Sequence, residues 1–289
     1  MRDSLAMAPG AEALRPFADP VVRAGLAGCV RGAELPGRGA EGGARLGFGL
    51  ARVDDWLGGG LRRDGLHEFH AGDAVEADRA AATALALLLA MRALPAGAPL
   101  LWLMGAGGAA LPYGPGLVEL GVDADALLIA RLPDPVAVLK AAADAVRHGG
   151  AGAVLIGLDG RAPAFDLTAS RRLTLAAERT GTLVLMVRGG ATEAPTAAHS
   201  RWRVAGAPSP PLMAGAPGRP AFDLRLLRQR GGPPGLAVQL VWDRDDAAFR
   251  EYEAAAAGEA APPAPAAVPL SGGVAALPAR RAADRRRAA

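Results

Sequence analysis

Residues 65–89 read GLHEFHAGDAVEADRAAATALALLL, which is an apolar stretch, a short loop that opens at Gly72, and an alanine- and leucine-rich stretch. We expect a strand over residues 66–70 and a buried helix over residues 80–91, whose apolar run is too short to span a bilayer. A strand that leads through a loop into a helix N-terminus presents backbone amides suited to phosphate groups. The stretch therefore predicts an α/β fold of the phosphate-binding type.

The loop nevertheless lacks the side chains that nucleotide chemistry needs. In the pattern G-x-x-x-x-G-K-[ST], glycine amides cradle the phosphates, lysine neutralises them and a hydroxyl holds magnesium. Counted from Gly72, the last three positions hold Ala77, Asp78 and Arg79, and the one lysine of the chain, Lys140, lies elsewhere. Two like charges about 4 Å apart repel by roughly 1 kcal/mol in water and about 4 kcal/mol at an effective dielectric near 20. We therefore expect Asp78 to repel phosphate.

Two alternatives remain for this loop. Residues 72–79 can be an ordinary surface loop and helix start, in which the acidic residues favour the helix dipole. Arg79 can also act as a replacement cation.

Composition gives few further clues to function. The chain has 289 residues, a net charge of +3 and one cysteine, Cys29, so no internal disulfide is possible and a reducing compartment is natural. The N-terminus carries no sustained apolar stretch, so we expect no signal peptide and no membrane association. A cytoplasmic protein is the expectation.

From residue 46 onward, short apolar runs alternate with helical stretches, which is typical of a parallel sheet covered on both faces. Asp134 and Asp166 are expected to cap two of the helices, which end at Gly149 and Gly181. The expected strands cover residues 66–70, 100–104, 126–130, 153–158 and 182–187, followed by 201–204, 222–228 and 236–242, of which the last two form an antiparallel extension.

Three segments are predicted. Residues 1–45 form an N-terminal segment with a short helix over 21–30 and a glycine-rich linker, and residues 46–252 form the core. Residues 253–289, which are rich in alanine, proline and arginine, are expected to be disordered.

Several stretches resemble a known family. Tyr113, followed by LGVDADALL at residues 120–128, is similar to the core of the bacterial recombinase RecA. More specifically, residues 46–244 resemble the ImuA family of RecA-like accessory proteins. That resemblance rests on five stretches, LGGGL (57–61), GLHE (65–68), LTASRRL (167–173), SRWRV (200–204) and RQRGGPPG (228–235).

The resemblance implies a RecA-like fold of the P-loop NTPase type, with a mostly parallel sheet, flanking helices and a C-terminal antiparallel extension. It also implies a role in the SOS response, in mutagenic translesion DNA synthesis. The implied partners are ImuB, which is a Y-family polymerase homologue, and an error-prone replicative-type polymerase, with RecA as a further candidate.

When the chain is matched to the RecA pattern from Tyr113 backwards, the position of the RecA catalytic glutamate falls near Ala106. No carboxylate occurs between Trp102 and Glu119. Asp159 follows an apolar strand, as in a magnesium-orienting Walker B strand, although such an aspartate often only starts a turn. Arg188 stands where recombinases carry an amide. We therefore predict no catalytic residue and no cofactor.

A metal site is not expected either. His67 and His70 are three apart in a strand and point to opposite faces, and the chain has no cysteine cluster.

Arginines supply the candidate contacts to a partner or to DNA. Arg228 and Arg230 match two recombinase lysines that reach a neighbouring subunit's nucleotide, although charge that protects an edge strand is the alternative. Trp202 is the candidate for base stacking, and the helix arginines can also be a solvated face. DNA contact is expected to be weak or indirect. The full set of candidates is Arg171, Arg172, Arg201, Trp202, Arg203, Arg228 and Arg230.

The reading that joins these observations is a non-catalytic RecA-like adaptor of damage-induced mutagenesis. One rival is an ATP-dependent, DNA-binding recombinase, against which Asp78 and Ala106 argue. A second rival is an SOS-type inhibitor of cell division.

Overall fold

The computed structural model describes residues 43–73, 75–106, 111–190, 194–209 and 218–252. The predicted short helix over residues 21–30, most of the glycine-rich linker, and the predicted disordered tail over residues 253–289 lie outside these ranges.

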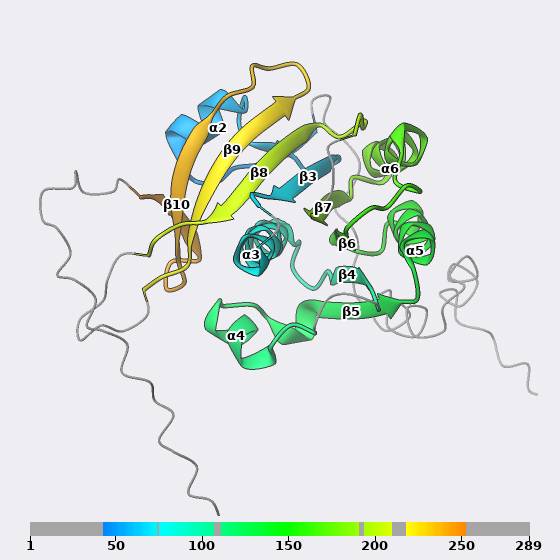
Figure 1. Ribbon diagram of the computed structural model, residues 1–289, viewed down its shortest axis with the longest axis horizontal. Helices are drawn as coiled ribbons and strands as arrows, with labels where there is room; N and C mark the ends of the chain where they lie inside the picture. Colours follow the sequence, from blue (N-terminus) through cyan, green and yellow to red (C-terminus); the bar gives the residue numbers. More distant parts are fainter. Residues whose placement is uncertain (1–42, 74, 107–110, 191–193, 210–217, 253–289) are drawn as a thin grey trace, which may run out of the picture. The chain divides into compact units, whose positions relative to one another are not determined.

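A nine-stranded sheet lies at the centre, in the order β11-β10-β9-β8-β3-β7-β6-β4-β5 (Figure 1). The six strands from β8 to β5 are parallel, and β9, β10 and β11 continue the sheet antiparallel from β8. The strands are β3 (Leu66–Ala71), β4 (Leu100–Gly105), β5 (Leu127–Leu132), β6 (Ala153–Asp159), β7 (Leu183–Gly189), β8 (Ser200–Gly206), β9 (Ala221–Gln229), β10 (Ala237–Asp243) and β11 (Ala248–Glu251). The predicted fold class is confirmed, and β11 is an addition to it.

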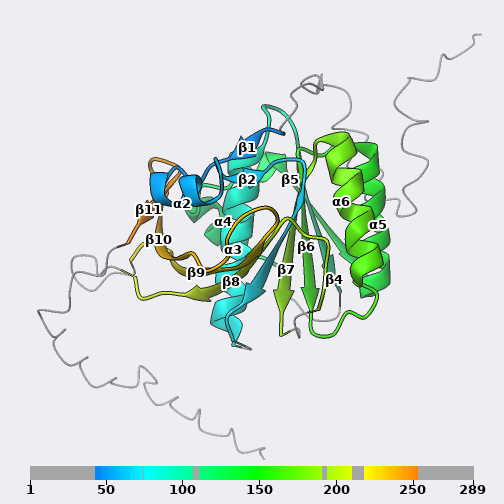
Figure 2. The same cartoon turned by 90° about the horizontal axis from the view of Figure 1, so that it is seen from above.

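Helices cover both faces of the parallel strands. Helix α3 (Glu76–Ala93) packs on one face, whereas α5 (Pro135–His148) and α6 (Leu167–Thr180) lie side by side on the other (Figure 2). Apolar side chains fill both layers, with Phe69 and Trp202 on the α3 side and Leu66 and Ile156 on the α5/α6 side. Within the described residues, no helix is long and apolar enough to cross a membrane.

The predicted helix caps are confirmed. The Asp134 carboxylate accepts a hydrogen bond from the Ala137 amide at 2.8 Å, and α5 ends at Gly149 with φ of 70°. The Asp166 carboxylate accepts from the Ala169 amide at 2.7 Å. These side chains satisfy amides that have no partner inside the first turn of a helix.

Short elements that the sequence did not predict flank the sheet. Strands β1 (Arg45–Leu46) and β2 (Leu61–Arg62) pair antiparallel around helix α2 (Ala51–Trp56), and α4 (Gly114–Glu119) with a 3-10 turn η1 (Ala124–Ala126) precedes β5. The α2–β2 turn requires glycine, because Gly60 has a φ of 108° and a β-carbon there would lie 2.3 Å from the Leu46 carbonyl oxygen.

Candidate functional site

The loop between β3 and α3 is held closed by the carboxylate of Asp78. This side chain is buried, and it accepts hydrogen bonds from the amide of Asp73 at 2.8 Å and from the amide of Gly206, at the end of β8, at 3.0 Å. A loop amide that would be available to a phosphate is thus already engaged by an anion of the chain itself. Asp78 also contacts Gly72 closely, since a β-carbon there would lie 2.9 Å from its Oδ2 atom.

Arg79 is engaged by two carboxylates. Its guanidinium pairs with Glu76 and, at 3.2 Å, with Asp159 at the end of β6. Hydrogen bonding to Glu76 is the main reason why the pKa of Arg79 lies above its ordinary value, with the charge of Asp159 adding to it. Arg79 and Asp159, both singled out from the sequence, are therefore brought together.

A small cavity of about 170 Å³ lies between these groups, at the carboxyl ends of β3, β6 and β7. Its charged lining residues are Asp73, Glu76, Arg79 and Asp159, so three carboxylates face one guanidinium. The cavity is smaller than the roughly 300–1,000 Å³ of typical small-molecule sites. Its charge disfavours a polyphosphate, and Ala77 is not among its lining residues.

Ala106 stands at the place predicted for a catalytic glutamate, and both its amide and its carbonyl are hydrogen-bonded. The Ala106 amide donates to the Leu132 carbonyl at 2.7 Å, and its own carbonyl accepts from the Arg131 guanidinium at 2.8 Å. The next residues, 107–110, lie outside the described part of the chain.

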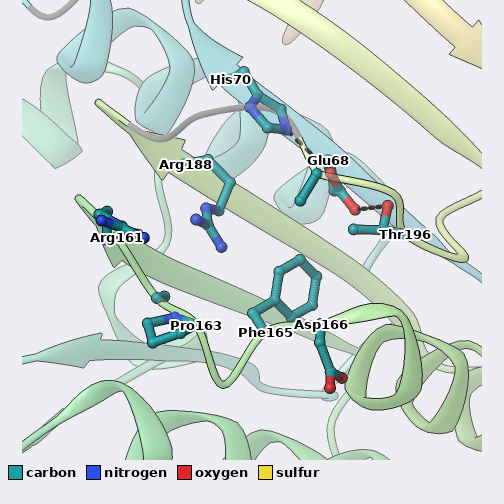
Figure 3. Close-up of a pocket in the computed structure, with 10 residues that line it drawn as sticks. Glu68, His70, Arg161, Pro163, Phe165, Asp166, Arg188 and Thr196 are labelled. Atoms are coloured by element: carbon teal, nitrogen blue, oxygen red, sulfur yellow. Dashed lines mark hydrogen bonds and ion pairs between the residues drawn. The ribbon is translucent and has the colours of Figure 1, made fainter.

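A larger cavity of about 410 Å³ lies on the α5/α6 side of the same sheet edge (Figure 3). Its wall includes Glu68, a carboxylate with a relative exposure of 1% in the middle of β3. Glu68 accepts hydrogen bonds from His70 at 3.0 Å, from the Thr196 hydroxyl and from Arg201 at 3.1 Å. Burial opposes its ionisation, but these partners outweigh burial and lower the pKa of Glu68 below its ordinary value.

Arg188 points into the same cavity, toward the space framed by Arg161, Phe165 and Glu68 (Figure 3). Its guanidinium lies 5.4 Å from the centre of the Phe165 ring, and its Nε has no hydrogen-bond partner among the described residues. Burial lowers the pKa of Arg188, and Glu68 opposes that shift. Arg188 is therefore a partly desolvated cation beside Glu68, whose carboxylate already accepts hydrogen bonds from three other residues.

Two predicted surface contacts are corrected. Trp202 has a relative exposure of 0%, because its indole faces the α3 side of the sheet and donates to Ser200 at 2.8 Å, so it cannot stack on a base. Arg201 is buried as well, since it pairs with Glu68 and hydrogen-bonds to Thr196 at 2.9 Å and to the Ala194 carbonyl at 2.6 Å. Arg201 is a structural cation of the buried network.

The other predicted arginines are exposed but do not form one patch. Arg171 and Arg172 lie on α6, and Arg203 on β8; Arg228 donates to the Thr196 carbonyl at 3.0 Å, and Arg230 lies in the β9–β10 turn.

Four basic residues, which we call the basic row, are cross-strand neighbours on four adjacent strands. Arg188 of β7 is opposite His70 of β3, His70 is opposite Arg203 of β8, and Arg203 is opposite Arg225 of β9. Arg225 was missed from the sequence, although its place two residues after Asp223 in an alternating strand puts both on one face.

The buried network was also missed from the sequence. A glutamate inside an otherwise apolar strand was the available signal for it, because a buried carboxylate needs partners. Within the described residues, no group of three or more histidine, cysteine, aspartate or glutamate side chains could hold a metal ion.

Comparisons with known proteins give the family. No protein-family model matches the chain. Protein ImuA of Caulobacter vibrioides, from strains NA1000 / CB15N and ATCC 19089 / CIP 103742 / CB 15, is 36% identical over 205 residues, which cover 66% of this chain and 80% of that protein. Among solved structures, the RadB recombinase aligns with 72% of this chain and 100% of its own at 15% identity and a TM-score of 0.49. The chain belongs to the ImuA family.

Proposed function

We propose that this protein is a non-catalytic RecA-like accessory protein of damage-induced mutagenesis. In this proposal it acts as an adaptor in SOS translesion DNA synthesis, together with an ImuB-like Y-family polymerase homologue and an error-prone replicative-type polymerase. Membership in the ImuA family supports the setting. The sheet and helices supply a platform, and RecA is a further candidate partner.

One observation carries the non-catalytic part of the proposal. The carboxylate of Asp78 accepts the Asp73 amide at 2.8 Å, in the loop where a nucleotide would need free amides and a cation. A bound triphosphate would have to displace this carboxylate, and it would then face the charges of Glu76 and Asp159 as well. The side chains of the loop therefore favour a closed, nucleotide-free state.

The experiment uses Asp159→Asn in a strain that lacks the chromosomal gene. An ATP-dependent protein would lose function, because this aspartate would orient the magnesium ion. An adaptor should restore damage-induced mutation as the wild type does and should co-purify with the Y-family polymerase homologue. Loss of mutagenesis by a variant that is as thermostable as the wild type would contradict the proposal. Filamentation on overexpression, with no effect on mutation frequency, would favour a division inhibitor instead.

A further inference from the structure

A polar cavity of about 410 Å³ lies at the amino ends of β3 and β8, the end of the sheet away from the phosphate loop. Four parts of the chain form it. They are the segment from β1 to β2, the starts of β3 and β8 with His67 and His199, and the β9–β10 turn.

Hydrogen bonds fix the walls of this cavity. The indole of Trp56 donates to the Pro233 carbonyl at 3.1 Å, and the Gln229 amide donates to the carbonyls of Trp56 and Pro233, each at 3.2 Å. Arg45 donates to the Gly60 carbonyl at 3.2 Å. The α2–β2 turn and the β9–β10 turn are thus tied together, and the cavity between them is preformed.

The inner wall has one defined hydrogen-bond chain. The Trp202 indole donates to the Ser200 hydroxyl at 2.8 Å, that hydroxyl donates to Nδ1 of His67 at 2.7 Å, and Nε2 of His67 donates to the Arg62 carbonyl at 2.9 Å. Every ring nitrogen of His67 is therefore satisfied with the imidazole neutral.

His199 differs from His67 in this respect. Its relative exposure is 6%, and neither ring nitrogen has a hydrogen-bond partner among the described residues. The nearest carboxylate oxygen, on Glu178 of α6, lies 3.4 Å from Nε2 of His199 and 3.7 Å from the Arg230 guanidinium. Both separations exceed the usual hydrogen-bond length of about 2.7–3.2 Å. A carboxylate therefore stands near both donors without bonding closely to either.

The charges that line the cavity favour an anion. Arg45, Arg62 and Arg230 line it, against the one carboxylate of Asp55. Arg62 is already held by both oxygens of Asp64, at 3.0 and 2.8 Å. The side chain of Arg230 is 61% exposed, so it can turn toward a ligand.

Four of the five stretches that carry the family resemblance contribute residues to this cavity. The lining residues from these stretches are Leu57, Gly58, Gly60, Leu61, His67, Ser200 and residues 229–233. The phosphate loop, residues 72–79, contains none of these stretches. Four of these five stretches thus come together at the amino end of the sheet, whereas residues 167–173 lie at the start of α6.

We propose that this cavity binds a carboxylate side chain from an acidic segment of a partner protein, with His199 and Arg230 as the donors. The incoming carboxylate would bond directly to these two donors, whereas Glu178 stays 3.4 Å from His199 and 3.7 Å from Arg230. A protein segment fits better than nucleic acid, because the arginines surround one cavity and do not follow the path of a strand of phosphates. The inference stands whether or not the partner is a polymerase.

The test uses the full-length chain and a fluorescein-labelled peptide in which consecutive glutamates stand between leucines. We expect this peptide to bind and its glutamine counterpart not to bind. Arg230→Glu and His199→Gln should each weaken binding about tenfold or more, because the first places a like charge beside the incoming carboxylate and the second replaces the buried imidazole. The matched control is Lys140→Glu, which makes the same change of charge at an exposed position on α5 and should bind as the wild type does.

A second readout locates the contact. In ¹⁵N-detected imidazole spectra, the glutamate peptide should shift the His199 resonance, which His199→Gln assigns by its loss. Equal binding of both peptides, an unmoved His199 resonance, or an equal loss of binding in Lys140→Glu would overturn the proposal. So would a single-stranded oligonucleotide that binds the wild type while the glutamate peptide does not.

Discussion

Asp78 and Gly206 are 128 positions apart in the chain, yet the Asp78 carboxylate accepts a hydrogen bond from the Gly206 amide at 3.0 Å. The same carboxylate accepts from the Asp73 amide at 2.8 Å. One side chain therefore joins the loop after β3, the first turn of α3 and the end of β8. An acidic residue in this loop is thus a structural tie between these three parts of the chain.

Asp78→Ala should destabilise the protein by about 2–4 kcal/mol, because two partly buried hydrogen bonds lose their charged acceptor. The measurement is the free energy of unfolding in urea. The matched control is Glu76→Ala in the same turn, where the side chain is 76% exposed and the change should stay within about 0.5 kcal/mol. Equal effects of the two substitutions would show that the Asp78 contacts contribute nothing.

His67 should remain neutral well below the pH at which a free histidine titrates. Burial lowers its pKa from 6.5 to about 4, against the opposing effect of the hydrogen bond to Arg62. Because the folded-state pKa is depressed, the associated stability is present above pH 6.5 and is lost as the pH falls toward about 4, by about 3 kcal/mol in total.

The direct measurement on His67 is an NMR titration of its imidazole. The Nε2-protonated neutral form should persist at about pH 5.5. A midpoint near 6.5 would contradict the buried hydrogen-bond chain from Trp202 through Ser200.

Glu68→Gln should destabilise the fold by about 3 kcal/mol, because it leaves the Arg201 cation buried without its carboxylate. The pKa of Glu68 lies below its ordinary value of 4.5, so its stabilising effect is present above that pH and is lost as the pH falls through the folded-state pKa. The variant should therefore show a weaker loss of stability in acid than the wild type. Glu119→Gln, at an exposed position, is the control and should follow the wild type at every pH.

Much of the fold could be predicted from local patterns. The apolar runs predicted five of the parallel strands and residues 201–204 predicted the sixth, while Asp134 and Asp166 marked the starts of two helices, because strand burial and helix capping depend on neighbouring residues. Strand β11 was missed because it is four residues long and Phe249 is its one buried side chain.

The site was predicted less completely. The sequence showed the acidic residue at position 78 but could not show Gly206 as its partner, since that contact depends on the packing of β8 beside β3. Trp202 was wrongly expected at the surface, although the two-residue period of a strand already separates it from Arg201 and Arg203. The burial of Arg201 follows from Glu68 on the neighbouring strand, a pairing that no local pattern reveals.

Arg225→Glu should stabilise the protein slightly, by about 0.2–1 kcal/mol, because it replaces a like-charge pair with Arg203 by an opposite-charge pair on adjacent strands. Thermal unfolding at low salt would show the gain, and added salt should reduce it. Arg171→Glu, on the exposed face of α6, is the control for the change in net charge. A lower melting temperature for Arg225→Glu alone would mean that the basic row is held by attractive contacts.

The central claim is that the Asp78 carboxylate stands where a nucleotide would bind, in the loop between β3 and α3. Calorimetric titration of ATP with magnesium into the full-length protein tests this claim directly. We expect no saturable heat of binding. Saturable micromolar binding of ATP, abolished by Asp159→Asn, would contradict it.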